Sequence, residues 1–275
     1  MSPTVRGARV LVTGATRGMG RLFAERAAAE GAAVLVLWGR DVDALQEVAA
    51  ALARPGLRVR TDAVDLDDVA ALDAAAHAVL ADLGAVDVLV NNAGVITSSG
   101  YFWQQDPAEA AHTLRVNTLA PMRLAAHFLP AMIADAARPK RVLNVASAAG
   151  IVPNPRMSVY AASKAALLSW SDTLRLELEQ AGHTHVRVTT FSPSYVSTGM
   201  FEGVRSVLLT PMLRPERAVD QAWRALLAGR AHVISPPTVH VARAARGLLP
   251  SRAWDRLAKA FGVHRSMEGF TGRPS

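Results

Sequence analysis

The chain has 275 residues, of which 51% are hydrophobic and 19% charged, so a large core is available and disorder or a coiled coil is excluded. Cysteine is absent, which excludes disulfide scaffolds, thiol nucleophiles and thiolate metal sites. No signal peptide is visible before the first strand-like segment, and no stretch approaches the ~20 apolar residues that a membrane span needs. We expect a soluble, cytoplasmic protein.

The net charge of +7 is concentrated near the carboxyl end. Residues 1–210 contain 19 Lys and Arg against 19 Asp and Glu, whereas residues 211–275 contain 11 against 4. Such a basic segment can contact nucleic acid or an anionic membrane surface. It lacks the interleaved aromatic side chains that bind single-stranded nucleic acid, so we expect no nucleic-acid partner. We interpret the excess mainly as a solvated helical face, with membrane-surface contact as the less favoured alternative.

Short β-branched segments alternate with longer, alanine-rich amphipathic segments. The predicted strands are Arg9–Thr13, Ala33–Trp38, Val59–Val64, Val86–Asn91, Arg141–Ser147, Val186–Phe191 and His232–Ile234. The predicted helices are 19–30, 41–53, 67–83, 107–136, 158–181 and 215–229. This alternation is typical of repeated β-α-β units, which form a parallel sheet. Gly31 and Gly182 stand where the ends of helices require a left-handed residue.

These elements form one series that no linker rich in proline or serine interrupts. The sequence therefore predicts a single α/β domain over residues 1–235, with a doubly wound (Rossmann) seven-stranded parallel sheet. Residues 236–275 are predicted to be a basic, amphipathic extension packed on the same domain, helical over 238–249 and 251–261. We expect the apolar face of its second helix in the core or at a subunit interface; covering the substrate cleft is the alternative.

A glycine-rich turn follows the first strand and opens the first helix. Glycines let the backbone turn tightly and approach a pyrophosphate, whose charge is favoured at the amino end of a helix. The position between strand and helix supports a dinucleotide site. The predicted contacts are Gly14, Thr16, Arg17, Gly18, Met19 and Gly20.

The end of the second strand bears on the choice between NAD and NADP. An acidic residue at this point binds the ribose hydroxyls of NAD, but the sequence has Gly39 there, followed by Arg40. The planar guanidinium of Arg40 suits a 2′-phosphate, and Arg17 adds a second cation. We therefore expect NADP(H) to be preferred over NAD(H). In the alternative, Arg40 only begins the next helix and Asp41 binds the ribose.

Candidate site residues also follow the next three strands, at the carboxyl edge of the predicted sheet. Asp65 and Leu66 follow the third strand, and the fourth ends in the sequence Asn-Asn-Ala-Gly, from which Asn92, Ala93 and Gly94 are predicted cofactor contacts. Ser147 ends the fifth strand. Tyr160 and Lys164 come next, and their spacing of four places both on one helix face.

With these motifs, residues 5–235 resemble the short-chain dehydrogenase/reductase family. Thr13–Gly20 corresponds to its glycine motif, 91–94 to its Asn-Asn-Ala-Gly motif, and Tyr160 and Lys164 to its Tyr-x-x-x-Lys pair. Ser147 matches the family's catalytic serine and Asn117 its helix asparagine.

Further segments resemble the branch that contains retinol/retinaldehyde and 17-beta-hydroxysteroid dehydrogenases. These segments are 197–203 and 270–273, while Trp38-Gly39-Arg40 resembles the NADPH-using retinaldehyde reductases. One residue departs from the family pattern: Ser194 replaces the glycine expected after Pro193, near the nicotinamide.

The resemblance implies a role for each matched residue. Tyr160 is the general acid/base, and Lys164 together with the oxidised nicotinamide is expected to lower the pKa of its phenol. Ser147 hydrogen-bonds the carbonyl oxygen, and Asn117 holds a water that links Lys164 to solvent. The predicted cofactor contacts also include Tyr160, Lys164, Pro193, Val196 and Thr198.

The residues expected to face the substrate are mostly apolar. They are Val95, Ile96, Ala149 to Asn154, Met157 and Ser158, with a lid at about 195–213. No Arg or Lys pair is placed to bind a carboxylate, which favours a small lipophilic carbonyl or alcohol substrate. The eight histidines are scattered, so we expect no metal site.

These observations predict an NADP(H)-dependent oxidoreductase that interconverts a lipophilic ketone or aldehyde and its alcohol. Two alternatives remain: an NAD-dependent hydroxysteroid or long-chain alcohol dehydrogenase, and a non-catalytic nucleotide-binding regulatory protein. By resemblance alone, we expect a homodimer or homotetramer formed through the helices at 107–136 and 158–181.

Overall fold

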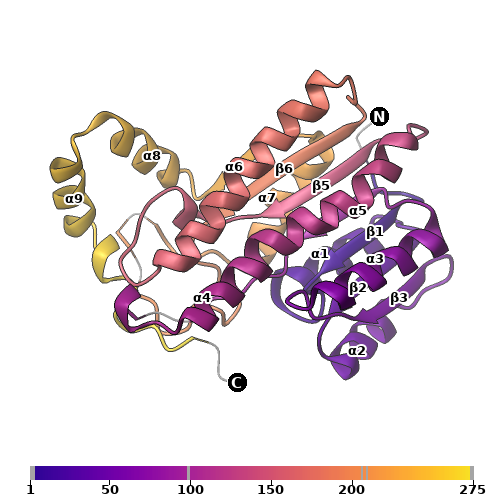
Figure 1. Ribbon diagram of the computed structural model, residues 1–275, viewed down its shortest axis with the longest axis horizontal. Helices are drawn as coiled ribbons and strands as arrows, with labels where there is room; N and C mark the ends of the chain where they lie inside the picture. Colours follow the sequence, from indigo (N-terminus) through magenta and orange to yellow (C-terminus); the bar gives the residue numbers. More distant parts are fainter. Residues whose placement is uncertain (1–3, 98–99, 206, 209, 273–275) are drawn as a thin grey trace.

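The computed structural model describes residues 4–97, 100–205, 207–208 and 210–272. Seven parallel strands form one sheet in the order β3-β2-β1-β4-β5-β6-β7 (Figure 1), which confirms the predicted fold class. The strands are β1 (Arg9–Thr13), β2 (Val34–Gly39), β3 (Arg58–Ala63), β4 (Val88–Asn91), β5 (Lys140–Val145), β6 (Val186–Pro193) and β7 (His232–Ser235). The strand order reverses between β1 and β4, which is where doubly wound sheets bind their ligands.

Helices cover both faces of the sheet because alternate residues of a strand point to opposite faces. Val10 and Val12 of β1 belong to a core with α1 (Gly18–Ala29), α2 (Val42–Leu52) and α7 (Pro215–Ala228). Leu11 belongs to the core of the other face, with α3 (Val69–Leu83), α5 (Ala120–Ala134) and α6 (Ser158–Gln180). Both faces of the central strand are therefore buried, as its continuous apolar sequence requires.

The predicted helix over 107–136 is wrong in one respect. The structure divides it into α4 (Pro107–Leu114), a π-helical turn over Arg115–Leu119 and α5. The buried side chain of Asn117 lies in this turn and hydrogen-bonds the backbone of Val95. The wider turn therefore coincides with hydrogen bonds to a segment outside the helix. A single π turn of this kind is frequent at functional sites. The helical periodicity of the sequence does not show it.

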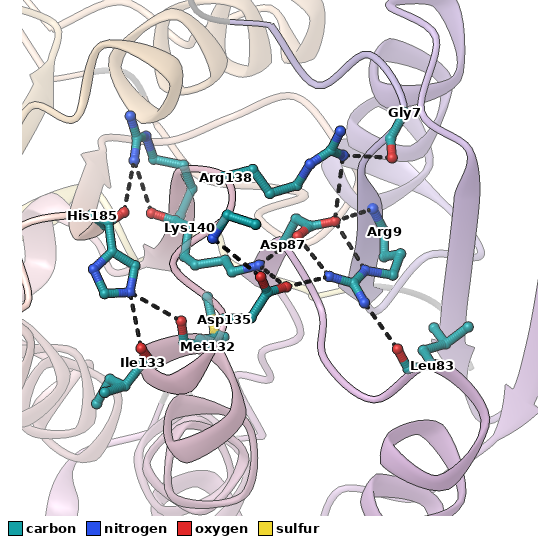
Figure 2. Close-up of polar contacts among 12 residues, drawn as sticks. Gly7, Arg9, Leu83, Asp87, Met132, Ile133, Asp135, Arg138, Lys140 and His185 are labelled. Atoms are coloured by element: carbon teal, nitrogen blue, oxygen red, sulfur yellow. Dashed lines mark hydrogen bonds and ion pairs between the residues drawn. The ribbon is translucent and has the colours of Figure 1, made fainter.

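A buried ionic network lies at the amino edge of the sheet, opposite the carboxyl ends of the strands (Figure 2). Asp87 accepts hydrogen bonds from the Arg9 backbone at 2.8 Å and from Lys140 Nζ at 2.7 Å. Asp135 accepts from Lys140 at 2.6 Å and from Arg9 at 2.8 Å. The side chains of Lys140 and Asp87 are 0% and 2% exposed, so each depends on its charged partners for the hydrogen bonds that water would otherwise supply.

The carboxyl-terminal extension forms two helices, α8 (Thr238–Leu248) and α9 (Ser251–Ala260), which project from the rest of the fold (Figure 1). Trp254 and Ala258 of α9 are buried, while Arg252, Arg256 and Lys259 on its other side are exposed. The amphipathic pattern read from the sequence therefore describes this helix. Within the described part of the chain, no helix is long and apolar enough to cross a bilayer.

Candidate active site

A cavity of about 450 Å³ opens at the carboxyl edge of the sheet. Residues that follow β1 to β6 line it, because the carboxyl ends of parallel strands meet at one edge. It brings together all but two of the predicted cofactor and catalytic residues. Those that line it are Gly14, Thr16, Arg17, Gly18, Met19, Gly39, Arg40, Asp65, Leu66, Asn92, Ala93, Gly94, Ser147, Tyr160, Lys164, Pro193, Val196 and Thr198.

Gly20 is a predicted contact that does not line the cavity. It is buried in α1, and a Cβ there would lie 2.0 Å from the Gly14 carbonyl oxygen. Its lack of a side chain therefore permits the close packing of the turn against the helix. Gly14 and Gly18 have φ angles of 65° and 56°, which only glycine adopts at low cost. Arg17 stands at the N-cap of α1, and its side chain makes no hydrogen bond to the first backbone N–H groups of the helix. These groups can therefore donate to an anion.

At the end of β2, Asp41 is engaged in helix capping. Its Oδ1 accepts a hydrogen bond from the Ala44 backbone at 3.0 Å and so caps α2. Arg17 and Arg40 are both exposed residues in the lining of the cavity. A Cβ at Gly39 would lie 2.8 Å from the Thr16 methyl carbon, so the glycine leaves this wall open.

His112 is a lining residue that the sequence analysis missed. Its Nδ1 lies 3.1 Å from Asp67 Oδ2, and Arg115 donates to the same carboxylate at 2.6 Å and 3.0 Å. The hydrogen bonds of Arg115 and His112 hold the pKa of Asp67 at about 2. Nothing in the sequence around His112 marks it as a lining residue.

Ser147, Tyr160 and Lys164 meet in the inner part of the cavity. They are 7%, 6% and 3% exposed. Lys164 Nζ donates to the Val145 carbonyl at 2.9 Å and lies 5.9 Å from the centre of the Tyr160 ring. The fifth strand thus positions the serine and holds the lysine, while one face of α6 carries both the lysine and the tyrosine.

The pKa of Tyr160 moves against the sequence-based expectation in the protein alone. Burial raises it to about 12, although the hydrogen bond with Ser147 opposes this shift. Burial also lowers the pKa of Lys164 to about 8. Desolvation of the phenolate thus outweighs the hydrogen bond with Ser147. The phenol of Tyr160 is therefore protonated at neutral pH.

Asn117 is the second predicted residue outside the cavity lining. Its Oδ1 accepts from the Val95 backbone at 2.8 Å, and its Nδ2 donates to Val95 O at 2.9 Å and to Ser163 Oγ at 3.1 Å. A Cβ at Gly94 would lie 3.3 Å from both Asn117 Oδ1 and Lys164 Nζ, so these two groups flank the same glycine. Asn117 ties the segment after β4 to α6 and thereby fixes the surroundings of the lysine. Its role in holding a water stays a prediction.

A second cavity of about 100 Å³ adjoins the first and shares Ser147, Ser194 and Phe201 with it. Its other lining residues are mostly apolar: Ala148, Ala149, Val152, Asn154, Met157, Tyr195, Val207, Thr210, Val239, Ala242 and Val263. Four of the predicted substrate-facing residues are among them, and Val95 lines the first cavity; Ser158 lines neither. Ser206 and Leu209 of the predicted lid, and Arg273 of the closing motif, lie outside the described residues.

Residues of the carboxyl-terminal extension line the second cavity. Val239 and Ala242 of α8, together with Val263, cover the second cavity. The first helix of the extension therefore covers the cavity next to Ser147, while Trp254 of the second helix is buried, as expected for its apolar face. Nothing local in the sequence of α8 marks these small apolar residues as a cavity wall.

Phe201 belongs to the predicted lid but was not predicted as an individual contact. Its ring lies 5.9 Å from Tyr160 and 5.2 Å from Tyr195, centre to centre. Further lining residues of the larger cavity that were not predicted as contacts are Trp38, Ala44, Val64, Val116, Val145, Ala146 and Met200.

Comparison with known proteins identifies the family. Residues 8–208 match the short chain dehydrogenase family. The chain is 36% identical over 249 residues to estradiol 17-beta-dehydrogenase 11 of Pongo abelii, covering 90% of this chain and 81% of that protein. It is 32% identical over 272 residues to epidermal retinol dehydrogenase 2 of Mus musculus, covering 98% and 87%. The predicted resemblance to the retinol and 17-beta-hydroxysteroid dehydrogenase branch is confirmed.

Solved structures show the same architecture. A short chain dehydrogenase/reductase from Burkholderia phymatum in complex with NAD gives a TM-score of 0.79 at 27% identity, covering 88% of this chain and 94% of that one. A short-chain dehydrogenase from Sphingobium yanoikuyae in complex with NADPH gives 0.74 at 30% identity, covering 92% and 93%. This chain therefore belongs to the short-chain dehydrogenase family of oxidoreductases.

Proposed function

We propose that this protein is an NADP(H)-dependent carbonyl reductase that interconverts a lipophilic ketone or aldehyde and its alcohol. The observation that carries the proposal is the meeting of Ser147, Tyr160 and Lys164 in one buried cavity. A hydroxyl and a protonated phenol at this place supply hydrogen bonds, and an ammonium supplies positive charge. Both stabilise a carbonyl oxygen while it gains negative charge.

The residues of the larger cavity fit a nicotinamide dinucleotide. The glycine turn, with the uncapped amino end of α1, suits a pyrophosphate, and the solved relatives hold NAD or NADPH. Arg17 and Arg40 in the lining suit a 2′-phosphate; Asp41 also lines the cavity, but its Oδ1 already caps α2. These contacts favour NADP(H) over NAD(H).

The reaction divides between cofactor and protein. When bound in the larger cavity, a reduced nicotinamide would supply the hydride. Ser147 donates a hydrogen bond that positions the carbonyl oxygen, and Tyr160 donates its phenolic proton to that oxygen. Because the pKa of Tyr160 is about 12, the phenol holds this proton at neutral pH, which favours its work as an acid in reduction. Lys164, held by Val145, places a positive charge near the phenol as its proton leaves.

The lining of the smaller cavity supports a lipophilic substrate. Met157, Tyr195 and Phe201 belong to one apolar cluster with Tyr160, so the group that bears the carbonyl is surrounded by hydrocarbon and aromatic surface. Burying such surface is favourable by roughly 25 cal/mol for each Å² removed from water.

Replacing Arg40 with alanine tests the cofactor assignment. A hydrogen bond to a charged group contributes about 1.5–3 kcal/mol, so we expect NADPH to bind roughly 10- to 100-fold more weakly, and NADH to change by less than about threefold. Tryptophan fluorescence measures both affinities, since Trp38 lines the cavity. The matched control is the exposed Arg252 of α9, whose replacement with alanine is expected to change neither affinity. Equal losses for both cofactors on replacing Arg40, or tighter NADH binding by the unaltered protein, would contradict the assignment.

The pH dependence of ketone reduction follows from Lys164. Its pKa is lowered to about 8, so its positive charge is present below this pH and is lost as the pH rises through it. We expect kcat/KM for reduction to be level at lower pH and to fall above about 8, since this ratio reports groups of the free enzyme. A Lys164→Arg variant, whose charge persists above pH 12, should lack this decline even if its rate is low. An unchanged profile in that variant would assign the decline to another group.

A further inference from the structure

The first helix of the carboxyl-terminal extension has an apolar face on the side away from the fold. α8 packs through Val239, which is buried, and Ala242, which lines the smaller cavity. On the opposite side, Val241 and Leu248 are 70% and 84% exposed. Residues seven apart lie on one face of a helix, where a surface helix ordinarily carries polar side chains. α8 therefore presents apolar side chains to solvent.

The turn between α8 and α9 continues this apolar surface. Leu249 is 38% exposed, and the exposed Pro250 separates it from the first residue of α9. In Figure 1, α8 leads away from the sheet and the turn follows at its outer end. Val241, Leu248 and Leu249 thus form an apolar strip that the described part of the chain leaves largely uncovered.

The second helix of the extension presents cations on its outward face. Trp254 and Ala258 anchor α9 to the fold. Arg252, Arg256 and Lys259 are exposed and follow one another at spacings of four and three, which places them in one row along the opposite face. Among the described residues, no carboxylate forms an ion pair with any of these three.

The charge of the extension is not compensated locally. Residues 236–261 contain five Lys and Arg against a single acidic residue, Asp255. Elsewhere, exposed cations share carboxylates, as Arg58 and Arg60 share Asp82. Uncompensated charge of one sign destabilises a compact state through self-repulsion. The combination of free cations and an apolar strip fits a partner that is both anionic and apolar.

An anionic lipid bilayer offers both properties at one surface. Its headgroups attract Arg and Lys, and the acyl chains directly beneath accept Leu and Val. A nucleic acid supplies the charge but leaves the leucines in water. A second copy of this chain carries the same cations, so a symmetric contact through this surface would bring like charges together.

We propose that α8, the following turn and α9 form a docking surface for an anionic phospholipid bilayer. The apolar strip enters the interfacial region, and Arg252, Arg256 and Lys259 contact the headgroups. The exposure of the leucines, which the sequence alone does not give, favours this reading of the basic segment over a solvated helical face. The inference goes beyond the proposed function and does not depend on it, because neither the strip nor these cations line either cavity.

Co-sedimentation of the whole protein with vesicles tests the inference. The vesicles contain phosphatidylcholine alone, or phosphatidylcholine with about one third phosphatidylserine. We expect tight binding only with phosphatidylserine. Binding should weaken as the salt rises from about 0.1 M to about 1 M, where the Debye length falls from about 10 Å to about 3 Å. No binding at the lower salt concentration, or equal binding to both kinds of vesicle, would overturn the inference.

Two double variants separate the apolar from the ionic contribution. Leu248→Ser with Leu249→Ser removes most of the strip, and we expect the partition coefficient to fall about 10- to 100-fold. Arg252→Gln with Arg256→Gln removes two cations, each of which contributes about fivefold, so a loss of about 25-fold is expected. All four residues are exposed, so the fold should tolerate both changes. Unaltered binding in either variant would overturn the inference.

Matched controls lie on other helices. Val69→Ser removes an apolar side chain of α3 that is 48% exposed. Arg217→Gln with Arg230→Gln lowers the net charge by the same amount at exposed positions in and after α7. We expect either control to change the partition coefficient less than about threefold. Losses as large as those of the extension variants would show that net charge or exposed apolar area acts without a defined surface, and would contradict the inference.

The absence of cysteine allows a readout at one position. Leu249→Cys, labelled with a fluorophore that is sensitive to polarity, should shift its emission to the blue on phosphatidylserine vesicles. Val69→Cys with the same label should show no shift. A shift at both positions or at neither would overturn the proposed orientation.

Two further outcomes assign the surface to another partner. Binding to soluble polyglutamate or to DNA as tight as to vesicles, with no loss on replacing the leucines, would overturn the lipid assignment. So would a protein that ignores vesicles but changes from oligomer to monomer in Leu248→Ser with Leu249→Ser, as measured by light scattering. Conversely, vesicle binding that requires the strip, in a protein that reduces no ketone, would support this inference while the proposed reductase function fails.

Discussion

Replacing Tyr160 with phenylalanine is expected to reduce turnover of an apolar ketone about 10²- to 10⁴-fold while NADPH binding is retained. A positioned general acid contributes a factor of this size. Among the described residues, Tyr160 is the only tyrosine that lines the larger cavity together with Ser147 and Lys164. The ring remains, so the edge-to-face contact with Phe201 and the packing of the cavity are preserved. NADPH oxidation measures turnover, and protein fluorescence measures cofactor binding.

The other two tyrosines provide controls with different expected results. Tyr101 is 42% exposed and stacks on Trp103 outside both cavities, so Tyr101→Phe should retain turnover. Tyr195→Phe removes one hydroxyl that hydrogen-bonds Asn154 and Ser266, and we expect it to lower turnover much less than Tyr160→Phe does. Full activity in Tyr160→Phe would exclude the proposed acid and make the non-catalytic nucleotide-binding alternative the stronger one.

Replacing Asp87 with alanine is expected to lower the free energy of unfolding by about 3–5 kcal/mol at pH 7, since it breaks a buried ion pair and leaves charge behind. Lys140, which is fully buried, would keep only Asp135 as a charged partner, and Arg9 would lose the carboxylate that it binds through its backbone and side chain (Figure 2). Urea unfolding followed by circular dichroism measures the loss. Asp82→Ala is the control, because it removes a partner of Arg58 and Arg60 at the surface and should cost much less.

The same network predicts the direction of the acid dependence. Burial acts to raise the pKa of Asp87, but the hydrogen bonds of Arg9 and Lys140 outweigh it and hold this pKa below its ordinary value. Lys140 holds the pKa of Asp135 at about 2. Carboxyls with lowered pKa values stabilise the fold above about pH 4, where the unfolded chain is also ionised, and this contribution is lost as the pH falls toward 2. The difference between the parent and Asp87→Ala should therefore shrink below pH 4; a constant difference would contradict the role of ionisation.

The sheet was predictable from the sequence because each element satisfies a local rule. The apolar segment of β1 and the alternation with amphipathic helices require a parallel sheet buried on both faces. Gly31 and Gly182, predicted to be left-handed, have φ angles of 85° and 79°. The candidate catalytic residues Ser147, Tyr160 and Lys164 were predicted from a strand end and a shared helix face together with the resemblance to a known family.

Contacts between distant segments were not predictable in this way. The π-helical turn at Asn117 accompanies hydrogen bonds to Val95 and Ser163, which lie 22 and 46 residues away in the chain. The raised pKa of Tyr160 follows from burial that depends on the whole fold. Val239 and Ala242 cover the second cavity, but nothing in their own neighbourhood of the sequence distinguishes them from other small apolar residues of a helix.

The residues that line the two cavities come from different parts of the chain. The larger one is lined by described residues from Gly14 to Phe201, whereas the wall of the smaller one extends through α8 to Val263. A change in the carboxyl-terminal segment therefore alters the wall of the smaller cavity and leaves the described lining of the larger one unchanged. Exchanging residues 236–272 with those of a relative would present a new wall to an unaltered Ser147. In this chain, the wall of the smaller cavity can thus be changed at one end of the sequence without a change at the glycine-rich end.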